Sequence, residues 1–215
     1  MSRLTRALFA LLLLGAPLAL ARANDSRTLS LEADLDGDGR VERMTLDAAR
    51  GLALAVRHGR RLVWEGVYGR WRPWKLAAAD VDGDGRREIV VGVFKSTKFI
   101  PRPHNCLFIY DWDGRRATPK WLGSTLSRPF LDFGFADTDG DSRDELYAVE
   151  TKRDGRQTVA AYSWNGFGFT QDWQRGDWLK ARLVSVRGDE RTIEADGERV
   201  VQKAHFKTAD RLSAP

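Results

Sequence analysis

The sequence predicts an all-β protein: a β-propeller-like repeat of three clear blade units and one degenerate unit, preceded by a cleaved signal peptide. Three observations predict this class. An acidic pattern, D-x-D-G-D-x-R-x-E, occurs three times. Apolar segments with two-residue alternation flank each copy, which is typical of strands. Hairpin dipeptides recur downstream. Units of about 50 residues with several short strands are the size of propeller blades.

Residues 1–23 have the three parts of a secretory signal peptide in the right order. Arg3 and Arg6 give a positive start, residues 7–20 are apolar, and residues 21–23 form an A-x-A cleavage site. We therefore expect the mature chain to begin at Asn24 and to be periplasmic or secreted. The chain has no run of about 18 apolar residues, so no integral membrane segment is expected.

Charge and cysteine content exclude several classes of protein. The formal net charge is +5, with 35 basic and 30 acidic side chains. Removal of residues 1–23 takes away Arg3, Arg6 and Arg22, which leaves 32 basic against 30 acidic side chains. This near-neutral balance, with both signs interspersed, argues against nucleic-acid binding. The single cysteine, Cys106, excludes an internal disulfide framework and a four-cysteine zinc site.

Residues 24–215 are expected to form one domain with units of about 24–73, 74–129, 130–177 and 178–215. In the first three units an apolar or aromatic segment leads into the acidic pattern and a strand-like run follows it. The leading segments are residues 29–31, 74–79 and 130–136, and the following runs are 44–46, 89–94 and 146–149. In the fourth unit residues 178–184 match the leading segments, but residues 185–189 have lost the carboxylates at positions 1 and 3.

A second motif marks the end of each unit. Residues 110–114 and 162–166 both run from tyrosine through tryptophan to an Asp-Gly or Asn-Gly hairpin signal, and Trp121 and Trp173 lie seven residues after the glycines. His58-Gly59, followed by Trp64, is a weaker version, and Asp196-Gly197 makes one more hairpin. Repetition at matched positions favours packing between blades for these tryptophans; exposed aromatic platforms for a ligand are the alternative.

The acidic pattern predicts calcium binding, with two to three structural Ca²⁺ sites. Carboxylates at positions 1, 3, 5 and 9 repel each other unless a cation neutralises them. Ca²⁺ accepts six to eight oxygen ligands in flexible geometry, whereas Mg²⁺ keeps waters and needs a strict octahedron. Position 12, which is Glu in an EF-hand, holds Thr45, Val91 or Ala148. The expected ligands are Asp34, Asp36, Asp38 and Glu42; Asp80, Asp82, Asp84 and Glu88; and Asp137, Asp139, Asp141 and Glu145.

These loops resemble the FG-GAP or VCBS-type repeat, the calcium-loop blade of integrin-α-like β-propellers. Phe133-Gly134 ahead of the third pattern matches the FG element, and Val91-Gly92-Val93 after the second resembles the strand that ends in the GAP element. The resemblance covers roughly residues 28–165. It implies four-stranded blades with Ca²⁺ in loops between the strands of a blade. Ser142 departs from the pattern because it replaces the turn glycine, so a weaker third site is expected.

Three arrangements of the blades are consistent with the repeat count. The units would close as a small four-bladed ring, remain an open arc, or complete a ring by self-association. An open arc would expose sheet edges, which proteins usually cover.

The predicted function is an exported, non-enzymatic calcium-binding protein whose blades present a binding surface for a protein or glycan partner. The candidate partner-binding residues surround the longest and least periodic stretch of the chain: Trp71, Trp74, Lys95, Lys98 and His104. The alternative is an enzyme or enzyme subunit that acts on extracellular polymers and uses the propeller as a scaffold. His104 and Cys106 form the one local pair that suggests nucleophilic chemistry, although a cysteine before an apolar run is usually buried packing.

Overall fold

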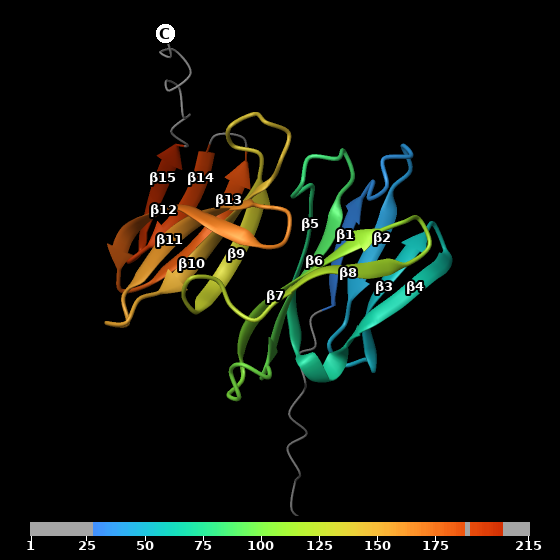
Figure 1. Ribbon diagram of the computed structural model, residues 1–215, viewed down its shortest axis with the longest axis horizontal. Helices are drawn as coiled ribbons and strands as arrows, with labels where there is room; N and C mark the ends of the chain where they lie inside the picture. The colour runs from blue at the N-terminus through green and yellow to red at the C-terminus, as the bar shows by residue number, and fades with distance from the viewer. Residues whose placement is uncertain (1–27, 188–189, 204–215) are drawn as a thin grey trace, which may run out of the picture.

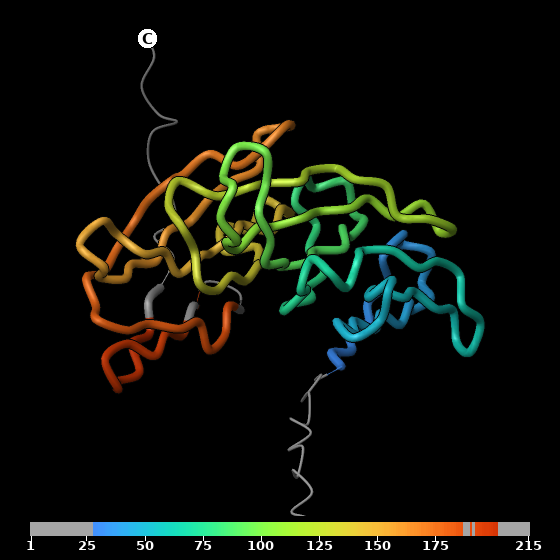
Figure 2. Tube along the Cα trace, turned by 90° about the horizontal axis from the view of Figure 1, so that it is seen from below, coloured from blue at the N-terminus to red at the C-terminus, as the bar shows by residue number. Residues whose placement is uncertain are grey.

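A computed structural model describes residues 28–187 and 190–203, and this part of the chain is all-β. Fifteen strands and one turn of 3-10 helix, η1 (Gly69–Trp71), form four antiparallel sheets within it (Figure 1). The predicted signal peptide, residues 1–23, lies outside the described residues. The sheets follow one another around an arc in chain order (Figure 2), as the blades of a four-bladed propeller do.

Each sheet is a meander of neighbouring strands, as hairpin connections dictate. The first contains β1 (Leu29–Ala33), β2 (Glu42–Leu46), β3 (Leu52–His58) and β4 (Arg61–Tyr68). The second contains β5 (Pro73–Ala79), β6 (Glu88–Lys95), β7 (His104–Trp112) and β8 (Ala117–Gly123). The third contains β9 (Phe130–Ala136), β10 (Glu145–Thr151), β11 (Gln157–Trp164) and β12 (Phe169–Trp178). The fourth contains β13 (Ala181–Arg187), β14 (Glu190–Ala195) and β15 (Glu198–Lys203).

The predicted turns connect strands as expected. The glycines of the Asp-Gly and Asn-Gly dipeptides, Gly114, Gly166 and Gly197, have φ of 82°, 98° and 89°, a left-handed conformation that glycine adopts without steric cost. The all-β class predicted from two-residue alternation is confirmed.

The fourth sheet differs from the expectation in one detail. The alignment of repeats placed a decayed loop at residues 185–189, but β13 continues through Arg187. The physical reason is the missing carboxylates: without them the wide acidic turn has no side chains to cap its backbone, and the strand pairs with β14 up to Glu190.

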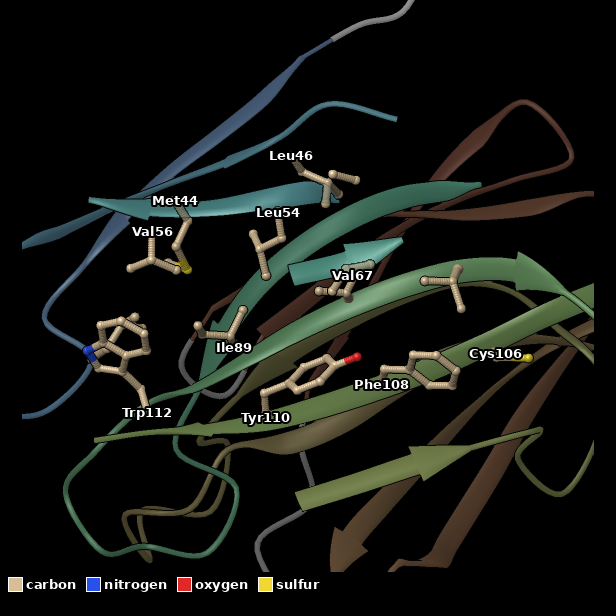
Figure 3. Close-up of a cluster of buried hydrophobic side chains, with 14 residues drawn as sticks. Met44, Leu46, Leu54, Val56, Val67, Ile89, Cys106, Phe108, Tyr110 and Trp112 are labelled. Carbon is tan, nitrogen blue, oxygen red and sulfur yellow. The ribbon is translucent and has the colours of Figure 1, made fainter. Parts of the chain in front are cut away.

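Hydrophobic cores lie between consecutive sheets. The first core joins β2 and β3 to β6 and β7, and Figure 3 shows Met44, Leu54 and Val56 of the first sheet facing Ile89 and Trp112 of the second. A second core, with the fully buried Phe130 and Phe133, joins the second sheet to the third, and a smaller one around Ile193 joins the third to the fourth.

The middle sheets are buried on both faces. In β6 the side chains of Ile89 and Val91 point toward the first sheet, while Val90 between them points toward the third. In β2, by contrast, buried and more exposed residues alternate. A strand that is apolar on both faces belongs in the interior of a stack of sheets, and an alternating strand belongs at its end.

The outer faces of the first and fourth sheets are polar. An exposed Arg43–Glu32 ion pair of 2.6 Å lies on the first, and an exposed Arg182–Glu194 pair of 2.5 Å lies on the fourth. Among the described residues, each of the three buried cores joins sheets that are consecutive in the chain, and none joins the fourth sheet to the first. The four blades therefore form an arc whose two ends face solvent.

Candidate metal sites

The three acidic patterns form the loops between the first and second strands of the first three sheets. We call residues 34–42, 80–88 and 137–145 the first, second and third loops. They lie at one end of the sheets, along the upper edge in Figure 1. Backbone hydrogen bonds link them in series: Arg87 N–H donates to the Leu35 carbonyl at 2.9 Å, and Asp144 N–H donates to the Asp80 carbonyl at 2.6 Å. The loops thus tie neighbouring blades together.

All three loops share one hydrogen-bond pattern, which explains the residue types at its positions. The position 1 carboxylate accepts from the N–H groups of positions 4 and 6, at 2.9 and 2.9 Å for Asp34, 2.7 and 2.9 Å for Asp80, and 2.7 and 3.0 Å for Asp137. The position 5 aspartate accepts from position 7 at 2.8 Å in each loop. The position 9 glutamate accepts from position 2 at 2.8–2.9 Å.

The turns need left-handed backbone at positions 4 and 6. Gly39 and Gly85 at position 6 have φ of 84° and 83°, and Ser142 in the third loop adopts the same conformation, with φ of 71°. A residue with a Cβ is strained there. The third loop therefore keeps the shape of the other two at a conformational cost.

Each loop brings together carboxylate oxygens that could hold a metal ion, within 4.8 Å of one another. The third loop contributes all four predicted ligands, Asp137, Asp139, Asp141 and Glu145. The first contributes Asp34, Asp36 and Glu42, and the second contributes Asp80, Asp82 and Glu88. The remaining predicted ligands, Asp38 and Asp84, lie outside these groups.

The third loop has the strongest unneutralised negative charge. Burial raises the pKa of Glu145, hydrogen bonds from Thr138 oppose the shift, and the neighbouring Asp139 and Asp141 carboxylates raise the pKa further. Within the described residues, no lysine, arginine or histidine side chain forms an ion pair with this group. Four convergent carboxylates without a counterion fit a hard divalent cation.

The first loop has a histidine beside its closing glutamate. His58 Nε2 lies 2.5 Å from Glu42 Oε1, and Glu42 is completely buried. His58 pairs with Glu42 across β2 and β3, so the contact follows directly from the register.

The second loop has a lysine among its carboxylates. Lys120 Nζ lies 2.5 Å from Asp82 Oδ2, 2.8 Å from Glu88 Oε1 and 3.0 Å from Asp111 Oδ1. Burial alone would lower the pKa of Lys120, but the hydrogen bonds to these carboxylates outweigh it and hold the pKa above its usual range. The predicted ligands Asp82 and Glu88 thus already contact a cation.

The predicted partner-binding tryptophans pack between blades. Trp71 is half-buried against the first core and meets the Phe108 ring edge-on, with 5.5 Å between centroids. Trp74 packs against Phe133 at the same centroid distance in the second core. Both side chains, which were predicted to bind a partner, thus contribute to the packing between blades.

The other predicted partner-binding residues surround the β6–β7 connection, at the end of the sheet opposite the acidic loops. Lys95 donates to the Ser96 carbonyl at 2.7 Å, and its Nζ lies 5.7 Å from the Trp71 ring centroid. Lys98 is exposed, and the neighbouring Phe99 is 83% exposed. An exposed phenylalanine beside a free lysine is the most accessible apolar feature of this stretch.

The predicted contact between Cys106 and His104 is present. Cys106 Sγ lies 3.4 Å from His104 Nε2. However, Cys106 is fully buried, and burial raises the pKa of its thiol. A catalytic cysteine needs a lowered pKa and an exposed setting, and burial of Cys106 acts in the opposite direction.

Sequence reasoning missed three features of the surface and the loops. Lys120 and His58 were not connected to the carboxylates that they contact. A hollow of about 910 Å³ was also missed; Arg128, Lys152 and Arg153 are among its lining residues. It is built from separate segments around the third sheet, and no local motif marks it.

The chain matches no model of a known protein family, and a search of curated proteins finds no match. In the described part of the chain, no helix has the length and apolar character needed to cross a membrane.

Proposed function

We propose that this protein is an exported, non-enzymatic calcium-binding scaffold that presents a propeller-type surface to a protein or glycan partner. The observation that carries the proposal is the third loop, where four carboxylates meet and no ion pair from another described residue neutralises them. The features of residues 1–23 support export to a compartment where such loops meet free Ca²⁺. Extracellular calcium modules bind with dissociation constants on the order of 10⁻⁴–10⁻³ M.

Asp137, Asp139, Asp141 and Glu145 would hold the ion in the third loop. Bound Ca²⁺ supplies positive charge that neutralises the carboxylates. The chain's own contribution is to hold the loop open in the hydrogen-bonded shape already described. Asp144 of this loop bonds to Asp80 of the second, so an ordered third loop also supports the junction of two blades. The role proposed for the ion is therefore structural.

The first loop is proposed as a second, weaker calcium site. Asp34, Asp36 and Glu42 provide one ligand fewer than the third loop, and His58 contacts Glu42. Calcium affinity depends on the number of charged ligands, so fewer free oxygens mean weaker binding.

The partner is proposed to bind away from the acidic loops. The β6–β7 connection offers the exposed Phe99 beside Lys98, and aromatic side chains are enriched at binding surfaces. Cys106 beside His104 is fully buried, which fits packing better than nucleophilic chemistry. The propeller-type arrangement is compatible with a binding scaffold.

Thermal unfolding of the purified protein in excess EGTA, in millimolar Ca²⁺ and in millimolar Mg²⁺ tests the metal proposal. An ion that binds only the native state at 100 times its dissociation constant stabilises it by about 2.7 kcal/mol. We expect Ca²⁺ to raise the melting temperature of the wild type. Asp139→Asn should remove most of this rise, while Asp154→Asn, a matched change in a turn outside the loops, should retain it. A melting temperature that is the same in all three solutions would refute calcium binding.

Export and partner binding have separate tests. N-terminal sequencing of the protein recovered from outside the cytoplasm should begin at Asn24. A glycan array and a panel of purified cell-surface proteins should give a signal with the wild type that Phe99→Ala and Lys98→Ala weaken. Uncleaved protein confined to the cytoplasm would contradict the export proposal.

A further inference from the structure

We propose that the Lys120 ammonium group occupies the cation position of the second loop, so that the chain itself neutralises this loop without a metal ion. The proposal concerns a loop that the family resemblance assigns to Ca²⁺. It shares with the proposed function only the premise that each acidic loop needs a cation.

The contacts of Lys120 match those of a bound cation. Its Nζ lies 2.5, 2.8 and 3.0 Å from oxygens of Asp82, Glu88 and Asp111. An ammonium group has three N–H donors and no acceptor, so three carboxylates satisfy it completely. Asp82 and Glu88 also belong to the group of oxygens that could hold a metal ion. An ion and the ammonium group would therefore compete for the same ligands.

Glu88 is the buried carboxylate of the site, and its burial makes a counterion necessary. The Lys120 side chain is 13% exposed, and that of Glu88 is 3% exposed. A buried carboxylate without a partner is strongly disfavoured. The second sheet also lies between two hydrophobic cores, so disorder in its loop would disturb two blade interfaces.

A β-bulge places Lys120 at the loop, and the other blades supply matched comparisons. In each of the first three sheets, a tryptophan on the last strand pairs with a residue of the neighbouring strand: Trp64 on β4, Trp121 on β8 and Trp173 on β12. The residue just before each tryptophan has no partner in the register. The skipped residues are Val63, Lys120 and Asp172. A bulge redirects a side chain, and in the described blades this position carries a cation only in the second.

An arginine and a hollow also lie beside the second loop. The Arg143 side chain from the third loop lies against the loop, since a Cβ added at Gly83 would be 2.9 Å from Arg143 Cγ. Asp82, Lys120 and Arg143 line a shared hollow of about 460 Å³. The hollow connects the carboxylates to solvent, so an ion could enter if Lys120 were shortened or uncharged.

The test replaces Lys120 with methionine, which retains much of the side-chain length and removes the charge. Calcium stoichiometry is measured by equilibrium dialysis with Ca²⁺ alone, and unfolding is followed in EGTA and in Ca²⁺. We expect Lys120→Met to bind one more ion per chain than the wild type. Its melting temperature should fall in EGTA and recover in Ca²⁺. Adding Asp82→Asn should remove the extra ion.

Two results would overturn the proposal. One is an unchanged calcium stoichiometry in a folded Lys120→Met variant. The other is loss of a bound ion when Asp82→Asn is introduced into the wild type, because the second loop would then already hold calcium. The second result is available even if Lys120→Met fails to fold. In the wild type we expect Asp82→Asn to leave the stoichiometry unchanged and Asp139→Asn to lower it by one.

These outcomes separate the two proposals. If the wild type binds no calcium, the proposed function fails, but a Lys120→Met variant that gains an ion still supports the ammonium as the cation of the second loop. If the wild type binds calcium and Lys120→Met gains none, the proposed function stands and the Lys120 proposal fails.

Discussion

Replacing Ser142 with glycine should stabilise the protein, because Ser142 is held in a left-handed conformation. Its φ is 71°, close to the values of Gly39 and Gly85 at the same loop position. Left-handed backbone costs a residue with a Cβ roughly 1–2 kcal/mol. Glycine avoids this cost but increases the entropy of the unfolded chain, which is worth about 0.4–1 kcal/mol. The expected net gain is therefore about 0.5–1 kcal/mol in the free energy of unfolding.

The reverse substitution provides a matched control. Gly85 has φ of 83°, and a Cβ added there would meet no atom within 4 Å, so Gly85→Ser tests conformational strain without a steric clash. We expect it to destabilise the protein by about as much as Ser142→Gly stabilises it. Both variants keep the backbone N–H that donates to the position 1 aspartate.

Urea unfolding in EGTA measures both changes without a contribution from bound ions. For a chain of this size, 1 kcal/mol corresponds to a shift of about 2–4 °C in melting temperature. Unequal slopes of unfolding free energy against urea would indicate a change in the unfolded state rather than in the loop. A neutral or destabilising Ser142→Gly, together with a neutral Gly85→Ser, would refute the argument that left-handed backbone is costly here.

Three further changes test the packing and the buried charge. Phe133→Ala should lower the free energy of unfolding by about 3–5 kcal/mol, because the ring is fully buried against Trp74; a loss below about 1 kcal/mol in urea would contradict this interface. Gly69→Ala should cost about 1–3 kcal/mol, since its Cβ would lie 2.0 and 2.8 Å from two backbone carbonyl oxygens, whereas Gly51→Ala meets nothing within 4 Å and should be tolerated. Burial raises the pKa of Glu150, so the native state keeps this proton where the unfolded state releases it. Stability should then fall as pH rises from the ordinary carboxyl value of 4.5 through the raised pKa, and Glu150→Gln should flatten this slope; parallel urea profiles from pH 4 to 7 would exclude the effect.

The fold could be predicted from the sequence because each blade repeats the same local signals. Two-residue alternation, a sharp acidic turn and an Asp-Gly or Asn-Gly hairpin all act over a few residues. The acidic loops illustrate this: the hydrogen bonds from backbone N–H groups that recur in all three turns join positions within one nine-residue pattern. Local rules therefore sufficed for the strands and the loops, whereas the repeat count left three arrangements of the blades open.

The counterions could not be predicted in the same way, because they come from distant strands. Lys120 is 32 residues from Glu88 and reaches it only through a bulge in β8. A signal for it does exist in the sequence. Aligning the units on Trp64, Trp121 and Trp173 places a lysine where the other units have Val63 and Asp172.

The expected order of metal affinity among the three loops depends on charge as well as on turn geometry. The sequence argument expected a weaker third site because Ser142 replaces glycine. The third loop nevertheless forms the same backbone hydrogen bonds and gathers all four of its carboxylates, whereas Asp38 and Asp84 lie outside the groups of the other two. Ser142 raises the conformational energy of the third loop. The number of carboxylate oxygens without a counterion determines which loop most needs an ion.

If both proposals hold, the three loops differ in the origin of their positive charge, and this difference has a consequence for assembly of the arc. A free ion binds according to its concentration, but a lysine of the same chain is present at every calcium concentration. Lys120 and the second loop belong to the second sheet, which is buried on both faces. In a chain of blades stabilised by nearest-neighbour interfaces, a disordered middle blade breaks two interfaces and an end blade only one. A permanent cation in the second loop would therefore keep the first and second cores intact before calcium is encountered, and the third loop would gain its charge afterwards.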